Sequence, residues 1–185
     1  MIIGITVISC TLLYSIMLAM VYYNKPRINS TENKIYSILV RMNVFGLILE
    51  LACTYFVYTN GITPFNTLMC VICNRLFIIY LLSWELIFTL YIFFVSFGET
   101  TTFKEQLKKH SKDFKYILIL FSIVMMILSI TLPLQYFNDG NYVYSYGPAT
   151  NLLVVIGGIF ICIDIYCVSK NVKHIKNRKY IPLLV

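Results

Sequence analysis

Two long apolar runs, joined by a short polar turn, constrain the fold of this chain more than any other feature. The runs cover residues 35–59 and 67–97, and the turn between them is centred on Thr63. A helix rises about 1.5 Å per residue, so about 20 apolar residues cross a bilayer core of about 30 Å, and both runs are long enough. The sequence therefore predicts an antiparallel pair of transmembrane helices.

Four ionisable side chains lie inside these runs, Arg41 and Glu50 in the first and Arg75 and Glu85 in the second. When the two helices are reflected about Thr63, Arg41 comes level with Glu85, and Glu50 comes within one residue of Arg75. A charge at the bilayer centre costs at least about 2.5–3.5 kcal/mol by insertion scales, so such residues pair, face a cavity or serve a function. We predict Glu50 with Arg75 as the preferred ion pair and Arg41 with Glu85 as the second.

The second pair meets a geometric difficulty. Positions 41 and 50 are nine residues apart, which places them about 180° apart around a helix. Both can face the 67–97 helix only if Gly46 allows a local distortion. Asp164, at a comparable depth in a later run, is an alternative partner for Arg41. Two interpretations stay open: the charges only fix helix register, or they form a polar pocket for a ligand or ion.

The composition of the whole chain also indicates lipid surroundings. Apolar residues make up 59% of the sequence and charged residues 12%, with a mean hydropathy of +0.78, whereas soluble domains are nearer half apolar and a quarter charged. The predicted fold class is all-α, a polytopic transmembrane helix bundle with five full spans and the start of a sixth. The spans are expected at about 2–23, 35–59, 67–97, 116–134 and 152–169, with residues 180–185 beginning a run that the sequence cuts short.

The net charge of +7 does not indicate a nucleic-acid partner, because of where the basic residues lie. Two of the fifteen Lys and Arg residues lie inside apolar runs, and the other thirteen fall in segments 25–34, 104–115 and 170–179. Segments 60–66 and 135–151 carry none. The positive-inside rule predicts this alternation, so the basic segments are expected in the cytoplasm and the N-terminus outside the cell membrane. The predicted partner is the lipid bilayer, including its anionic headgroups.

The segment 135–148 is a second candidate site. Residues 138–141 (Asn-Asp-Gly-Asn) have turn chemistry, and Tyr142, Tyr144 and Tyr146 alternate as in a strand. These rings favour either of two interpretations. They form a recognition surface for a peptide or small-molecule signal, or they belong to the aromatic belt at the headgroup level.

The sequence predicts no catalytic site, metal site or cofactor. It contains no Walker loop, no Gly-rich nucleotide fingerprint and no recognisable Ser/His/Asp arrangement, and His110 and His174 lack metal-ligand spacing. The six cysteines lie within or at the ends of apolar runs, so a disulfide framework is not expected. Cys70 and Cys73 form a C-x-x-C pattern that we interpret as small apolar filler rather than a redox pair.

Three stretches carry a resemblance to a known family. Residues 27–36 (RINSTENKIY) and 144–149 (YSYGPA) resemble the N-terminal membrane region of sensor histidine kinases from Gram-positive bacteria of the clostridial type, and residues 179–183 (KYIPL) look like the entry to their next span. The resemblance covers most of the chain. It implies two further spans and a cytoplasmic kinase core beyond this sequence, and it carries no catalytic residue over.

The expected function is therefore that of a membrane-embedded signal-input module that is not an enzyme in itself. Its expected partners are a downstream kinase domain and, if it forms a homodimer, a second copy of the same chain. Two alternatives stay open. A small transporter or permease would use Glu50, Glu85 and Asp164 to line a polar path, and a membrane scaffold would use the charges only to set helix register.

Overall fold

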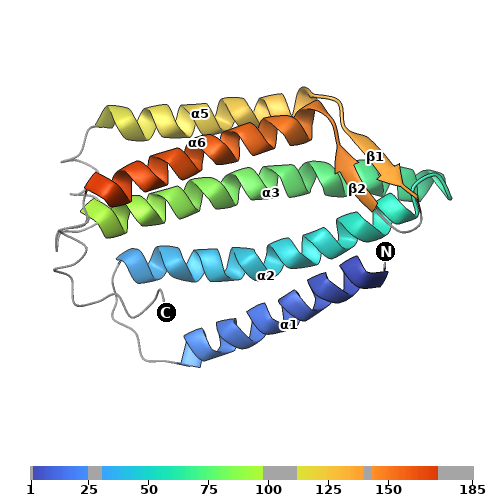
Figure 1. Cartoon of the computed structure of the whole chain (residues 1–185), viewed down its shortest axis with the longest axis horizontal. Coiled ribbons are helices and arrows are strands. Elements are labelled where there is room, and N and C mark those ends of the chain that lie inside the picture. Colours follow the sequence, from blue (N-terminus) through green and yellow to red (C-terminus); the bar gives the residue numbers. More distant parts are fainter. Residues whose placement is uncertain (1, 25–30, 98–111, 140–142, 171–185) are drawn as a thin grey trace.

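The computed structural model describes residues 2–24, 31–97, 112–139 and 143–170, and within these ranges it shows five long helices and one two-stranded hairpin (Figure 1). The elements in chain order are α1 (Ile2–Asn24), α2 (Thr31–Tyr58), α3 (Pro64–Phe97), α5 (Lys112–Thr131), β1 (Gln135–Asn138), β2 (Val143–Tyr146) and α6 (Pro148–Lys170). The helices lie alongside one another, and both β-strands lie at one end of the bundle. We call this end the hairpin end and the opposite one the far end.

Four of these helices are long and apolar enough to cross a membrane. Their apolar stretches are Gly4–Asn24, Asn33–Tyr58, Pro64–Phe93 and Pro148–Ser169, in α1, α2, α3 and α6. In α5 the apolar stretch found among the residues whose side chains are described is shorter, Ile119–Leu128, and the helix ends at Thr131, two residues before Pro133, which cannot donate a helical hydrogen bond. The described residues therefore show four candidate spans where the sequence predicted five. The predicted start of a sixth lies outside the described residues.

Two helices begin about one turn before their predicted spans, each at a proline. Pro64 opens α3 and Pro148 opens α6, because proline has the φ angle of the first helical turn and lacks an N–H that would have no helical partner there. Thr63 caps α3, since its Oγ1 accepts a hydrogen bond of 3.1 Å from the backbone N–H of Asn66.

The predicted turn between α2 and α3 is confirmed by a contact in the middle of the two helices. Gly46 and Tyr80 each lie 17 residues from Thr63, and the Tyr80 ring fills the space that a Cβ on Gly46 would need. The Phe45 ring lies edge-on to Tyr80, with centroids 6.1 Å apart. Gly46 therefore makes room for an aromatic ring and leaves α2 continuous, instead of supplying the local distortion considered above.

Aromatic side chains join the first three helices at the far end. Tyr22 of α1 packs against Tyr36 of α2 at a centroid distance of 5.0 Å, and Tyr36 packs against Tyr91 of α3 at 5.8 Å. The Tyr23 hydroxyl lies 2.9 Å from Ser37 Oγ. Such contacts hold helices together in lipid, where burial of apolar surface supplies little driving force.

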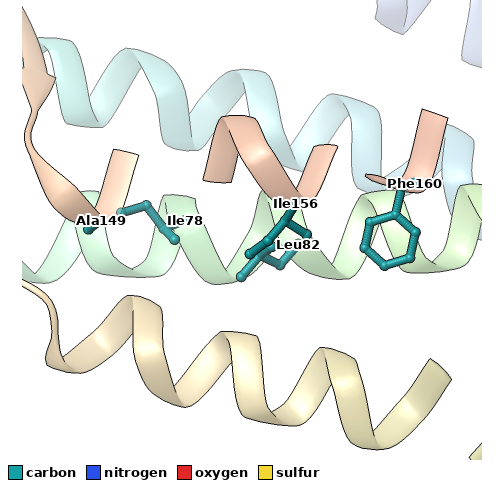
Figure 2. Packing of buried hydrophobic residues seen from close by; sticks show 5 residues of the cluster. All are labelled: Ile78, Leu82, Ala149, Ile156 and Phe160. Carbon is teal, nitrogen blue, oxygen red and sulfur yellow. The ribbon is translucent and has the colours of Figure 1, made fainter. Parts of the chain in front are cut away.

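The buried apolar core lies between α3 and α6, and α5 packs against both (Figure 2). Its members are Ile78, Leu82, Ala149, Ile156 and Phe160. Because α3, α5 and α6 follow one another through the bundle, α3 and α6 run in the same direction, from the hairpin end to the far end (Figure 1). This parallel pairing of α3 and α6 forms the site described next.

Candidate functional site

The interface between α3 and α6 holds two carboxyl groups, one from each helix. Glu85 of α3 rests on Gly157 of α6, and Glu85 Oε1 lies 2.8 Å from the position that a Cβ on Gly157 would occupy. Any larger residue at position 157 would push the carboxyl away. A Cβ on the neighbouring Gly158 would meet nothing within 4 Å, so of these two glycines only Gly157 allows a close approach of α3.

Asp164 of α6 lies beside Thr89 of α3, one helical turn beyond Glu85. The carboxyl of Asp164 and the hydroxyl of Thr89 are close enough to interact, and Thr89 is only 2% exposed. Within the described part of the chain, however, Thr89 Oγ1, Asp164 Oδ1 and Glu85 Oε2 are all buried and make no hydrogen bond of acceptable geometry. We call Glu85, Thr89, Gly157 and Asp164 the acidic site.

Helix geometry explains why these residues meet. Glu85 and Thr89 are four residues apart and Gly157 and Asp164 are seven apart, so each pair shares one face of its helix. Helical side chains lean toward the N-terminus of their helix, and α3 and α6 both begin at the hairpin end. Side chains on these two helices therefore lean in the same direction, which lets Asp164 reach back to the level of Thr89.

The structure does not bring Arg41 and Glu85 together. Arg41 is exposed, and its Nε donates a hydrogen bond of 3.2 Å to the Ser37 carbonyl oxygen of its own helix, whereas Glu85 faces α6. Because α2 and α3 are antiparallel, residues at equal depth lean toward opposite ends of the bundle. Asp164, the alternative partner for Arg41, faces Thr89.

Glu50 and Arg75 lie at similar depths but act on different neighbours. Glu50 interacts electrostatically with Tyr80, and Arg75 interacts with Tyr136 at the hairpin end. The same opposite lean accounts for this, because Glu50 on α2 leans toward the far end and Arg75 on α3 toward the hairpin end. The ion pair between Glu50 and Arg75 stays a prediction.

The aromatic segment forms a β-hairpin with one exposed aromatic face. Strands β1 and β2 are antiparallel, and Phe137 pairs with Tyr144 in their register. The Phe137 and Tyr144 rings stack at 5.0 Å, and Tyr146 meets Tyr144 edge-on at 6.1 Å. The predicted strand alternation is thus confirmed at Tyr144 and Tyr146, while Tyr142 lies outside the described residues.

The other face of the hairpin is attached to the helices. Tyr136 hydrogen-bonds the Cys70 thiol of α3, and burial raises the pKa of Tyr136 to about 12, with Cys70 adding to the rise and the Arg75 guanidinium opposing it. The Tyr136 hydroxyl therefore stays neutral and able to donate at physiological pH. Asn138 Nδ2 donates a 3.0 Å hydrogen bond to the Tyr58 carbonyl oxygen at the end of α2.

Sequence reasoning identified neither Tyr136 nor Asn138 as attachment points. The period of two in the strand offered a signal for Tyr136, since it lies on the face opposite to Tyr144 and Tyr146. The pairing of Asn138 with a helix end 80 residues away had no comparable signal.

No group of three His, Cys, Asp or Glu side chains within the described ranges is placed to hold a metal ion. All six cysteines are free thiols. No protein-family model matches the sequence, and no curated protein and no solved structure matches it either.

Proposed function

We propose that this chain is the membrane-embedded signal-input module of a bacterial receptor of the histidine kinase type, and that its β-hairpin receives the signal. The observation that carries this proposal is the set of attachments of the hairpin. It bonds to the end of α2 through Asn138, bonds to α3 through Tyr136, and continues through Gly147 into α6. A displacement of this one element would act on three helices at once.

The exposed face of the hairpin offers a binding surface for a peptide or a small molecule. Phe137, Tyr144 and Tyr146 are 38%, 52% and 43% exposed, and their mutual ring contacts hold them in place. Aromatic rings supply large contact areas at low cost in side-chain entropy. A ligand that binds one hairpin position better than another shifts the population of the helix arrangement attached to it.

The proposed topology follows from the charge distribution. The basic segments lie in the cytoplasm, the N-terminus and the hairpin lie outside, and α5 acts as a fifth span despite its shorter apolar stretch. The end of α6 then enters the cytoplasm and leads toward a kinase core, in a single chain or a homodimer.

The attachment of the hairpin can be tested in a fusion of the whole chain to a cytoplasmic histidine kinase core. Tyr136→Phe removes the hydroxyl that bonds Cys70, and Asn138→Ala removes the bond to Tyr58. We expect each substitution to change basal autophosphorylation severalfold, because each frees the hairpin from one helix.

Tyr55→Phe is the matched control, because Tyr55 lies on an exposed face of α2 near the same end of the bundle. It should leave autophosphorylation unchanged. Equal output from all four proteins at equal expression would contradict a signalling role for the hairpin.

The arrangement of the carboxyl groups favours a transporter as a second candidate. Glu85 and Asp164 lie in one interface, as an ion path requires, although Glu50 lies on the other side of α3, against Tyr80. Uptake of labelled solutes by proteoliposomes carrying the chain would separate transport from signal input.

A further inference from the structure

We propose that an exposed stripe of α2 binds an anionic phospholipid, whose phosphate is held by the guanidinium of Arg41. The site lies in the half of α2 nearer the far end, on the outside of the bundle. The proposal goes beyond the proposed function and depends on neither the hairpin nor a kinase, because it concerns the other end of the molecule. It assigns a ligand to an arginine that the helix packing leaves exposed.

The first argument is the environment of Arg41. This residue lies within the apolar stretch Asn33–Tyr58 of α2 and is exposed. Its Nε donates a hydrogen bond of 3.2 Å to the Ser37 carbonyl oxygen, and within the described part of the chain the guanidinium makes no other interaction. An arginine has five N–H donors, so its terminal amino groups remain available for a ligand. A cation in this position is costly unless it finds an anion or water.

The intramembrane carboxyl groups whose side chains are described act elsewhere. Glu85 rests on α6 and Asp164 lies beside Thr89, both in the α3–α6 interface. Glu50 is nine residues from Arg41, which places it on the opposite side of α2. These three carboxyl groups therefore leave Arg41 to another anion.

The second argument is the depth of the guanidinium. Helical side chains lean toward the N-terminus of their helix, so Arg41 extends toward the far end, to the level of Ser37. The Tyr23 hydroxyl of α1 contacts the same carbonyl oxygen at 3.1 Å, so it lies within about 6 Å of Arg41 Nε. Tyr22 and Tyr36 pack against each other at this end of the bundle. Tyrosines gather at the headgroup level of membranes, so the guanidinium lies where a phospholipid carries its phosphate.

The third argument is the order of exposed residues along α2. Alternating spacings of four and three residues place five exposed side chains on one face of the helix, and these are Lys34, Ile38, Arg41, Phe45 and Ile48. The two cations lie nearer the far end, and Phe45 and Ile48, 58% and 52% exposed, continue toward the middle of the bilayer. A phospholipid has the same order, with its phosphate outside and its acyl chains inside. A phosphate on Arg41 therefore places acyl chains along Phe45 and Ile48.

The chemistry of the headgroup follows from the guanidinium. Its planar fork of donors matches two oxygen atoms of one phosphate, whereas Lys34, nearer the helix start, adds attraction as a point charge. Phosphatidylcholine also carries a phosphate, but its own trimethylammonium group competes with Arg41 for it. Phosphatidylglycerol carries the phosphate without a cation. The ligand class is therefore an anionic phospholipid.

The test places a fluorescent reporter on the apolar part of the stripe. The full chain carries Trp84→Phe, which removes its single tryptophan, and Ile48→Trp, seven residues from Arg41 on the same face. It is reconstituted in phosphatidylcholine vesicles in which phosphatidylglycerol replaces phosphatidylcholine stepwise, at fixed pH and ionic strength. Brominated acyl chains quench tryptophan on contact, so brominated forms of each lipid report their relative affinity at the stripe. We expect phosphatidylglycerol to be preferred by about fivefold or more.

The variants decide whether the preference belongs to Arg41. Arg41→Gln should lower it by about fivefold, the usual effect of one cation near a membrane surface. Arg41→Lys keeps the charge without the fork, so its preference should lie between those of Arg41→Gln and the reporter chain. Lys108→Gln is the control, because it removes one charge from a basic segment, and it should keep the preference. The thermal unfolding midpoint in pure phosphatidylcholine checks that each variant is folded.

The proposal is overturned if both brominated lipids quench the reporter equally, or if Arg41→Gln leaves the preference unchanged. An equal loss in Lys108→Gln would also overturn it, because it would mean that the basic segments attract anionic lipid as a whole. Soluble glycerol 3-phosphate at fixed ionic strength should not abolish the preference; if it did, the site would take a free anion instead of a lipid. A failed hairpin test with a positive lipid test would leave this inference standing, so the two proposals fail independently.

Discussion

At the residue scale, Gly46 fixes how closely α2 and α3 approach each other. The Tyr80 ring occupies the space of the missing side chain, so a methyl group there forces the ring to rotate or the helices to separate. Phe45 and Phe77 flank the same ring, with centroids 6.1 and 6.0 Å from it, which limits the room for rotation. The contact is therefore sensitive to a single added carbon atom.

We predict that Gly46→Ala destabilises the bundle by about 1–3 kcal/mol, the usual cost of overpacking a filled interface. The thermal unfolding midpoint in nanodiscs measures the effect, and Gly4→Ala is the control because a Cβ at Gly4 meets nothing within 4 Å. The double variant Gly46→Ala/Tyr80→Ala should lose less stability than the sum of the two single variants. Strict additivity would show that Gly46 and Tyr80 do not share a contact.

At the element scale, the relative depth of α2 and α3 was predictable from the sequence, but the surroundings of Arg41 and Glu85 were not. The contact between Gly46 and Tyr80, which lie equally far from Thr63 in the sequence, agrees with the reflection about Thr63. The same reflection placed Arg41 beside Glu85, because it compared backbone depths and ignored the direction in which side chains lean. In an antiparallel pair the two side chains lean apart, and in a parallel pair such as α3 and α6 they lean the same way.

The pairing of α3 with α6 was difficult to predict from the sequence for a second reason. Residues 98–147 separate the two helices in the chain, so no short turn fixes their relative depth as Thr63 does for α2 and α3. A glycine such as Gly157 indicates that a neighbouring helix can come close, but it does not identify that helix. The acidic site became visible only once the structure placed Glu85 on Gly157 and Asp164 beside Thr89.

The junction between β2 and α6 carries a prediction of its own. Gly147 has φ of +119° and a Cβ there would lie 3.3 Å from the Pro133 carbonyl oxygen, whereas Gly61 has φ of +84° and open space around it. Alanine is strained at both positions, but only at Gly147 does it also meet backbone. Gly147→Ala should therefore cost about 1–3 kcal/mol and more than Gly61→Ala, as measured by the thermal midpoint. An equal loss from both would show that the contact with Pro133 has no effect.

At the scale of the whole molecule, the alternation of helix directions places every described turn at one of two ends. The α2–α3 turn and the β-hairpin share the hairpin end, as the bond from Asn138 to the Tyr58 carbonyl oxygen shows, and the start of α2 lies at the far end (Figure 1). Thirteen of the fifteen Lys and Arg residues lie in three sequence segments, and each segment adjoins a helix end at the far end of the bundle. These helix ends are the ends of α1, α3 and α6 and the starts of α2 and α5 (Figure 1). The positive-inside rule therefore favours the orientation proposed above, with the far end in the cytoplasm.

This orientation is measurable with single added cysteines and a membrane-impermeant maleimide. Ile62→Cys lies in the α2–α3 turn and Lys34→Cys near the start of α2, and both positions are exposed. We expect Ile62→Cys to be labelled in intact cells and Lys34→Cys only after permeabilisation, each relative to the wild type with its six native cysteines. Labelling of both positions in intact cells would contradict a span between them. The reverse pattern would keep the span but invert the orientation, and with it the side from which the hairpin is reached.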